Sequence, residues 1–184
     1  MREIEVLAPA GSFDTMKAAY KAGADAVYMG GPMFGARAYA DNADAGQMLS
    51  AIDYAHLHGR KLYMTVNTLL KNTEIEGQLE DYIRPFYEQG LDAVIVQDLG
   101  VADYIHQRIP EMPLHASTQM TICSPSGAIW AKEHGFSRVV VAREMTRSEI
   151  QAVCAIGLEV EQFVHGALCM CISGQCYLSA LIGA

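Results

Sequence analysis

The sequence predicts an α/β fold, a (β/α)8 barrel of the TIM type that is incomplete in this chain. Short runs rich in β-branched and aromatic residues alternate with longer amphipathic stretches, which is typical of βα units that form a parallel sheet. The units repeat about every 25–30 residues, as expected for such a barrel, and the strand runs carry few charges. Three joints between a helix and the next strand also have similar sequences.

Seven segments are predicted to be strands, one fewer than a closed barrel of this type contains. They are Glu5–Pro9, Ala26–Met29, Lys61–Asn67, Ala93–Asp98, Pro113–Ser117, Arg138–Ala142 and Glu159–Val164. Six helices fit between them, near Ser12–Lys21, Ala43–His58, Thr73–Gln89, Val101–Arg108, Pro125–His134 and Thr146–Ala155. Ser12 and Thr73 are predicted N-caps, and Pro125 suits a first helical turn.

The three similar joints are KAGADAVYMGG, EQGLDAVIVQD and EHGFSRVVVAR. Each places a Gly just after a helix, where the left-handed C′ position favours this residue. The similarity can arise from this loop geometry or from internal repetition. An open doubly wound sheet is the alternative fold, but the segment after the first strand, Ala8–Ser12, lacks the GxGxxG phosphate turn.

Composition and charge narrow the class of protein. The 184 residues include 13 Lys and Arg against 21 Asp and Glu, a formal charge of −8, and 51% are hydrophobic, which is typical of a soluble globular protein. Apolar runs are far shorter than the roughly 20 residues of a membrane span, so no membrane contact is predicted. The N-terminus lacks the apolar core of a secretory signal, and five unevenly spaced cysteines do not indicate a disulfide framework. We therefore expect a cytoplasmic protein without a generally basic surface for nucleic acid.

Polar residues follow the predicted strands, at the end where barrels of this type carry their chemistry. The candidate catalytic residues are His115, Arg143, Glu144 and His165, and the candidate substrate-binding residues are Arg37, Asn67, Ser117 and Gln119. Arginines at such positions can bind carboxylate or phosphate, so a small anionic substrate is expected.

Structural roles stay open for several of these residues. Asn67 can cap a helix or loop, and His115 can be a hydrogen-bonded core histidine. His115 and Ser117 alternate along a strand and are expected to point the same way, into the barrel mouth. A salt bridge to Glu144 is the alternative role for Arg143.

Three cysteines, Cys169, Cys171 and Cys176, lie within eight residues after the last predicted strand. In a reducing compartment such a group indicates metal or iron–sulfur ligation. Cys169 and Cys176 flank a Ser-Gly loop and are the predicted ligands, whereas Cys171 is interpreted as a small packed hydrophobe. A [4Fe–4S] cluster usually needs four thiolates, and neither Cys154, read as helix core, nor Cys123 is a suitable substitute.

Two other classes of function stay open. A Cys/His protease would use a thiolate as nucleophile, with His115 or His165 as base. The sequence contains neither a nucleophile elbow nor an HExxH zinc motif. A non-enzymatic barrel that binds a partner is the third class.

Several motifs in order resemble the N-terminal part of the peptidase U32 family, historically called collagenase-like peptidases. They are Leu7-Ala8-Pro9-Ala10-Gly11-Ser12, Gly23-Ala24-Asp25-Ala26-Val27-Tyr28, Phe34-Gly35-Ala36-Arg37, Val66-Asn67-Thr68, His115-Ala116-Ser117-Thr118-Gln119, Ala142-Arg143-Glu144, Phe163-Val164-His165-Gly166-Ala167-Leu168-Cys169 and Ser173-Gly174-Gln175-Cys176. The similarity covers essentially the whole chain.

This resemblance implies oxygen-independent hydroxylation. Similar members act on a wobble uridine of tRNA, with prephenate as the hydroxyl source, on a cytidine of 23S rRNA, or on a ubiquinone precursor. They carry a [4Fe–4S] cluster held by four cysteines, of which the first two correspond to Cys169 and Cys176. The other two belong to a segment beyond the SSLIGGR-like stretch, inside which this sequence stops at residues 178–184.

We therefore expect residues 1–184 to be a truncated N-terminal barrel domain of a longer protein that hydroxylates an RNA base. A metal- or thiol-dependent peptidase is the alternative. The expected partners of the full-length protein are RNA and a small anionic metabolite. The chain itself is expected to show an open barrel edge, or to cover that edge with a second copy or another chain, and to hold no intact cluster.

Overall fold

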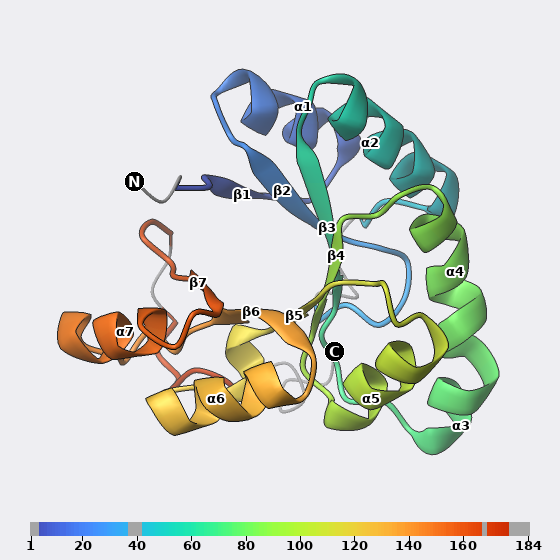
Figure 1. The fold of residues 1–184 in the computed structure, drawn as a ribbon. Helices are drawn as coiled ribbons and strands as arrows, with labels where there is room; N and C mark the ends of the chain where they lie inside the picture. The colour runs from blue at the N-terminus through green and yellow to red at the C-terminus, as the bar shows by residue number, and fades with distance from the viewer. Residues whose placement is uncertain (1–3, 37–41, 167–168, 177–184) are drawn as a thin grey trace.

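The computed structural model describes residues 4–36, 42–166 and 169–176. Seven parallel strands form one curved sheet, in which the strands follow one another in sequence order (Figure 1). They are β1 (Leu7–Ala10), β2 (Ala26–Gly30), β3 (Lys61–Val66), β4 (Ala93–Val96), β5 (Leu114–Ala116), β6 (Phe136–Val140) and β7 (Glu159–Glu161). All seven predicted strands are present, with shifted ends.

Helices cover the outer, convex face of the sheet (Figure 1). They are α1 (Phe13–Lys21), α2 (Ala45–Leu57), α3 (Asn72–Glu74), α4 (Glu80–Glu88), α5 (Leu99–Arg108), α6 (Pro125–Glu133) and α7 (Arg147–Cys154). A π-helical turn, η1 (Ile75–Leu79), joins α3 to α4, and a 3-10 turn, η2 (Thr118–Met120), follows β5. Among the described residues, no helix has the length and apolar character needed to cross a bilayer.

One of the two predicted N-cap residues is confirmed, and the other is not. Ser12 caps α1, because its hydroxyl accepts the N–H of Thr15 over 3.2 Å. The prediction that Thr73 is an N-cap is wrong, since Thr73 lies inside α3. Lys71 takes the N-cap position there, and its N–H donates to the Glu74 carboxylate over 2.7 Å.

The two faces of the sheet bury different side chains because neighbouring residues of a strand point to opposite faces. Met64 and Val66 of β3 belong to the main core, between the sheet and the helices. Tyr63 points to the other face, where it packs with Ala26 and Ala93 in a smaller cluster. This second cluster lies on the face of the sheet that is turned toward the barrel interior.

The three similar joints share one backbone geometry. Gly23, Gly90 and Gly135 have φ angles of 106°, 97° and 83°. Residues that carry a side chain rarely adopt a positive φ. Each joint therefore needs glycine to turn the chain from a helix into the next strand.

The sheet does not close into a full barrel within the described residues. β1 pairs with β2, β7 pairs with β6, and no pairing joins β7 to β1 there. The predicted fold, an incomplete TIM-type barrel with an open edge, is therefore confirmed. Coverage of this edge by a second copy or another chain stays a prediction.

Candidate functional site

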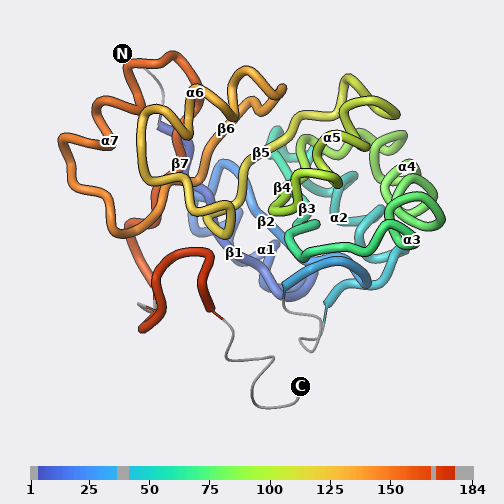
Figure 2. The backbone as a smooth tube through the Cα atoms, turned by 90° about the horizontal axis from the view of Figure 1, so that it is seen from below, coloured from blue at the N-terminus to red at the C-terminus, as the bar shows by residue number. Residues whose placement is uncertain are grey.

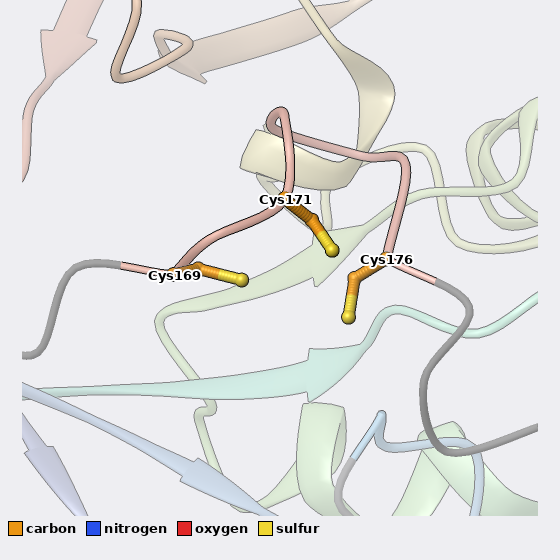
Figure 3. A group of neighbouring side chains, drawn as sticks. All are labelled: Cys169, Cys171 and Cys176. Carbon is orange, nitrogen blue, oxygen red and sulfur yellow. The ribbon is translucent and has the colours of Figure 1, made fainter. Parts of the chain in front are cut away.

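The three cysteines belong to a short segment, residues 169–176, which we call the cysteine loop and whose backbone is drawn in red in Figure 2. The Sγ atoms of Cys169, Cys171 and Cys176 all lie within 4.8 Å of one another (Figure 3). Cys169 and Cys176 are exposed, and Cys171 is half-buried. The interpretation of Cys171 as a packed hydrophobe is wrong, because the loop folds back and turns this thiol toward the other two. The adjacent Cys176 thiol raises the pKa of Cys171.

Arg143 holds the first half of the cysteine loop. Its guanidinium donates to the carbonyl oxygens of Cys169, over 3.2 Å, and Cys171, over 2.8 Å. It also lies 3.9 Å from the Glu144 carboxylate. The predicted anion-binding side chain is thus engaged with the backbone of the cysteine loop, in addition to the neighbouring carboxylate.

Glu144 and Ser173 hold the middle of the loop. The N–H of Ser173 donates to Glu144 Oε1 over 3.0 Å, and the N–H of Arg143 donates to the Ser173 hydroxyl over 3.2 Å. The hydrogen bond from this backbone N–H holds the pKa of Glu144 below its usual value. Both residues after β6 therefore position the loop.

Gly174 packs against the turn that follows β5. Its φ is 76°, and a Cβ there would lie 2.6 Å from the carbonyl oxygen of Gln119 and even closer to the Thr121 hydroxyl. Thr121, itself left-handed with a φ of 57°, donates to the carbonyl of Ser173 over 3.1 Å. Because a side chain does not fit at this contact, glycine allows the loop to rest on the end of β5.

Ser117 and Gln119 lie in that same turn. The buried Ser117 hydroxyl accepts the N–H of Gln119 over 3.2 Å, so it caps η2. Gln119 Oε1 and the hydroxyl of its neighbour Thr118 are buried and have no hydrogen-bond partner within the described structure. These two unpartnered atoms belong to the turn against which Gly174 of the cysteine loop packs.

His115 lies in the barrel interior. Its ring makes an edge-to-face contact with Tyr63, with centroids 4.7 Å apart, and is 4% exposed. Burial, together with the charge of Arg138, lowers the pKa of His115 to about 3, so the imidazole is neutral at pH 7. Its Nδ1 atom has no partner among the described residues.

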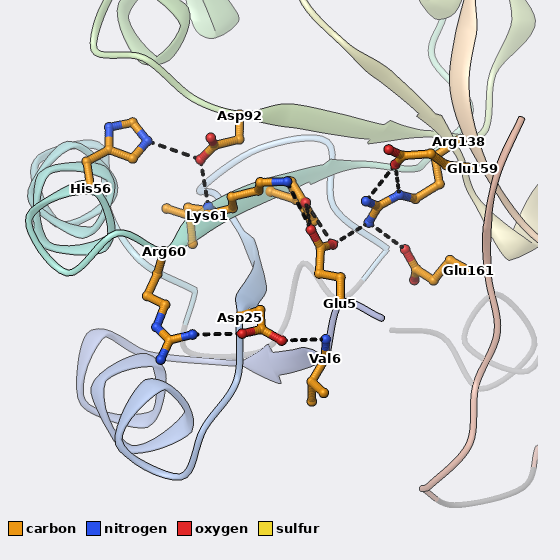
Figure 4. A network of polar contacts seen from close by, with 12 residues as sticks. Glu5, Val6, Asp25, His56, Arg60, Lys61, Asp92, Arg138, Glu159 and Glu161 are labelled. Carbon is orange, nitrogen blue, oxygen red and sulfur yellow. Dashed lines mark hydrogen bonds and ion pairs between the residues drawn. The ribbon is translucent and has the colours of Figure 1, made fainter. Parts of the chain in front are cut away.

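A charged network that sequence reasoning missed is centred on Arg138 (Figure 4), whose charge also acts on His115. The guanidinium of Arg138, in β6, donates to Glu5 over 2.8 Å and to Glu159 over 2.8 and 2.9 Å, and lies 3.6 Å from Glu161. Tyr63 donates to Glu5 over 2.9 Å. Burial raises the pKa of Glu161. The available signal was the unusual presence of Arg138, Glu159 and Glu161 inside short barrel strands.

The three remaining predicted site residues, Asn67, His165 and Arg37, do not belong to the cysteine loop. Asn67 follows β3, and its side-chain oxygen accepts the N–H of Ala36 over 3.0 Å. His165 follows β7 and is exposed. Arg37 lies outside the described residues.

The cysteine loop offers some of the ligands that an iron–sulfur cluster needs. Exposed, convergent thiols fit such a cluster or a thiophilic metal ion. A [4Fe–4S] cluster needs four thiolates, and the described residues bring three together. Cys123 and Cys154 do not belong to this group. The loop therefore fits part of the ligand set of a cluster.

Several relatives match nearly all of this chain, and two of them are described here. The 23S rRNA 5-hydroxycytidine C2501 synthase of Escherichia coli is 41% identical over 177 residues, which are 96% of this chain and 26% of the relative. The tRNA hydroxylation protein P1 of Bacillus subtilis is 36% identical over 176 residues, 95% of this chain and 42% of the relative. The chain thus spans less than half the length of either relative.

A solved structure of a U32 peptidase shares the fold, with a TM-score of 0.70 and 11% identity over 87% of this chain and 68% of that one. The family model described as peptidase family U32 matches residues 11–184. The chain, with its parallel barrel strands and its cysteine loop, is therefore a member of peptidase family U32.

Proposed function

We propose that this chain is the N-terminal barrel domain of a longer enzyme that hydroxylates a nucleobase in RNA. The observation that carries the proposal is the cysteine loop, packed on the ends of β5 and β6 in a chain whose relatives are named for rRNA and tRNA hydroxylation. In this proposal Cys169 and Cys176 supply two of the four ligands of a [4Fe–4S] cluster. Such a cluster supplies one-electron transfer when bound.

The proposed reaction replaces a ring C–H bond of the base by C–OH. A donor that gives its hydroxyl group and takes the hydrogen in return balances atoms and electrons without dioxygen, because the donor is reduced as the base is oxidised. A small anionic hydroxy acid such as prephenate fits this role. Arg37 is proposed to bind its carboxylate.

The other candidate residues receive roles that follow from their surroundings. Asn67, Ser117 and Gln119 are proposed to orient the donor or the base, and the unpartnered oxygen of Gln119 supports this. Arg143 and Glu144, proposed as catalytic, are better suited to positioning the cysteine loop through the hydrogen bonds described above.

Proton transfer is proposed for the two histidines. His165 is close to Cys169 in sequence and is exposed, so it can exchange protons with solvent. The neutral His115 offers an unpartnered nitrogen inside the barrel. Because His115 is buried and His165 is exposed, His165 is the better candidate for exchanging a proton with solvent.

RNA binding is proposed for the longer protein. The formal charge of −8 makes a general electrostatic grip by this chain unfavourable, so we assign the contacts with phosphates to other parts of the protein. Self-association through the open edge between β7 and β1 is a further proposal. The cytoplasm, which contains tRNA and ribosomes, is the location that this function requires.

The test uses the full-length protein in a deletion strain. Nucleoside mass spectrometry of tRNA and rRNA should show one hydroxylated nucleoside lost on deletion and restored by the wild-type gene. Cys169→Ser and Cys176→Ser should fail to restore it, whereas Cys154→Ser, which changes a thiol outside the loop, should succeed. An unchanged nucleoside profile in the deletion strain would overturn the proposal.

A peptidase is the second candidate, favoured by the exposed thiols of the loop and by the name of the family. Thiol peptidases pair their nucleophile with a histidine base. In the described part of the chain, neither His115 nor His165 hydrogen-bonds the Cys169 thiol. Cleavage of a peptide by the purified full-length protein, lost in Cys169→Ser, would support this candidate over RNA hydroxylation.

A further inference from the structure

Residues 31–36, which follow β2 and which we call the β2 loop, have no regular secondary structure but are held on one side by the end of β3. The hydroxyl of Thr68 donates to the carbonyl oxygen of Phe34 over 3.1 Å. The side-chain oxygen of Asn67 accepts the N–H of Ala36 over 3.0 Å. The second half of the β2 loop is therefore tied to the two residues that follow β3.

Tyr82, in α4, holds the first half of the β2 loop. Its hydroxyl donates to the carbonyl oxygen of Met33 over 3.0 Å and accepts the N–H of the same residue over 3.4 Å. Burial raises the pKa of Tyr82 to about 12, so the hydroxyl keeps its proton at pH 7. The Tyr82 ring also makes an edge-to-face contact with Phe34, with centroids 5.2 Å apart. A Cβ at Gly31 would overlap the Tyr82 hydroxyl, so this approach of the chain needs glycine.

Phe34 has a strained backbone in the middle of the β2 loop. Its φ is 61°, in the left-handed region that residues with a side chain rarely adopt. Strain of this kind persists only where surrounding contacts over-determine the conformation, and it is concentrated at functional sites. Among the described residues, one other non-glycine residue has such a φ, Thr121, which holds the cysteine loop.

The β2 loop lies at the same end of the barrel as the cysteine loop. The strands from β2 to β5 pair in parallel, so the loops that follow them share one end of the sheet. Gly174 packs the cysteine loop on the turn after β5, at this end. Barrels of this type bind their substrates there. The β2 loop is therefore a fixed part of the barrel mouth.

We propose that Tyr82, Thr68 and Asn67 are positioning residues, which hold the β2 loop as one wall of the site for a small anionic donor. This inference rests on the proposed function, in which Arg37, directly after the β2 loop, binds the carboxylate of the donor. Asn67 orients the donor through the backbone of Ala36, and Tyr82 acts from the helix layer without touching the donor.

The experiment measures the binding of prephenate to the full-length protein by calorimetry. Tyr82→Phe and Thr68→Val remove one hydroxyl each and keep the shape of the side chain. Each should weaken prephenate binding by about three- to tenfold, the equivalent of one hydrogen bond, because the strained loop then leaves its binding conformation more often. Thr68→Ser, which keeps the hydroxyl, should bind prephenate like the wild type.

Tyr87→Phe is the matched control, because it removes a hydroxyl from the same helix, one that donates to Glu111 and not to the β2 loop. Amide exchange of residues 31–36 should become faster in Tyr82→Phe and Thr68→Val and stay unchanged in Tyr87→Phe. Urea unfolding shows whether each variant is folded. The inference is wrong if Tyr82→Phe and Thr68→Val bind prephenate as tightly as Tyr87→Phe, or if their loop exchange is unchanged.

The outcome for the proposed function is read separately, from nucleoside mass spectrometry of the deletion strain. A wild-type protein that restores the hydroxylated nucleoside but binds no prephenate would overturn this inference and leave RNA hydroxylation standing. The expected pattern of prephenate binding, without any nucleoside lost on deletion, would support the positioning residues and overturn RNA hydroxylation.

Discussion

The carboxylate of Glu144 accepts a hydrogen bond from the backbone N–H of Ser173 over 3.0 Å. This bond connects the residue pair after β6 to the centre of the cysteine loop, 29 positions later in the chain. Ser173 is 4% exposed, so water cannot readily replace the carboxylate. The position of the thiols therefore depends on a side chain that is not a ligand.

Glu144→Ala should loosen the cysteine loop, because a buried N–H without an acceptor costs about 1–3 kcal/mol. Amide hydrogen exchange of residues 169–176 should become faster, and Glu144→Gln, which keeps an acceptor oxygen, should show a smaller effect. Glu133→Ala, on the exposed surface of α6, is the matched control. Equal exchange in Glu144→Ala and Glu133→Ala would contradict this role.

Gly174→Ala should displace the loop from the turn after β5. Its Cβ would meet the carbonyl oxygen of Gln119 at 2.6 Å. Gly59→Ala is the control, because Gly59 also has a positive φ, 63°, but nothing within 4 Å of the added carbon. The left-handed backbone destabilises both variants by about 1–2 kcal/mol. Urea unfolding should show a further loss of stability for Gly174→Ala. Its loop thiols should also react faster with a thiol reagent, and equal losses would contradict the close contact.

The buried His115 should make the protein less stable in acid. Its pKa is about 3 in the folded protein and 6.5 when unperturbed, so between these values the unfolded state binds more protons. His115 therefore makes the free energy of unfolding rise with pH up to about 6.5, by at most about 1.4 kcal/mol per pH unit. This contribution of His115 is lost as the pH falls toward 3.

His115→Phe should flatten this dependence, since phenylalanine keeps the ring contact with Tyr63 and does not titrate. Urea unfolding between pH 4 and 7 measures both slopes. Glu5 also loses stabilising contacts in acid, but it is present in both proteins. The difference between the two slopes therefore reports mainly on His115. Parallel slopes would show that His115 is not buried in neutral form.

Arg138→Met should destabilise the barrel strongly, because it leaves Glu161 without its cation and Glu5 with the more exposed Lys61 alone. Removing one partner of a buried ion pair costs about 3–5 kcal/mol. The double variant Glu5→Gln/Arg138→Met should recover part of the loss, as one of the unpaired charges is removed. Arg147→Met, at an exposed position of α7, serves as the control in chemical unfolding. A loss similar to that of Arg147→Met would mean that the network is weak.

The order and type of the elements were predictable because each is encoded by local periodicity. Their ends were not, since pairing with neighbouring strands decides them. The strand predicted at Glu159–Val164 ends at Glu161, where its register with Val140 of β6 also ends. The predicted helix at Thr73–Gln89 begins earlier and contains a π-helical turn that no local pattern announced.

The site was predictable to the extent that it is local. The cysteines lie close together in sequence, so their convergence was expected for Cys169 and Cys176, although the fold of the loop also brings in Cys171. The bonds of Arg143 to this loop span 26 and 28 positions, and such contacts appear only once the chain is folded. For the same reason the sequence could not distinguish a mouth position from an interior one for His115.

The contact between Glu5 and Arg138 also has a consequence for the order of folding. Strand pairings in the described sheet join consecutive strands, whereas these two residues are 133 positions apart. Closing so long a loop costs entropy that nearby strand pairs do not pay. We therefore expect the sheet to grow strand by strand and this pair to form late. Substituting Arg138 should then accelerate unfolding and leave the folding rate nearly unchanged.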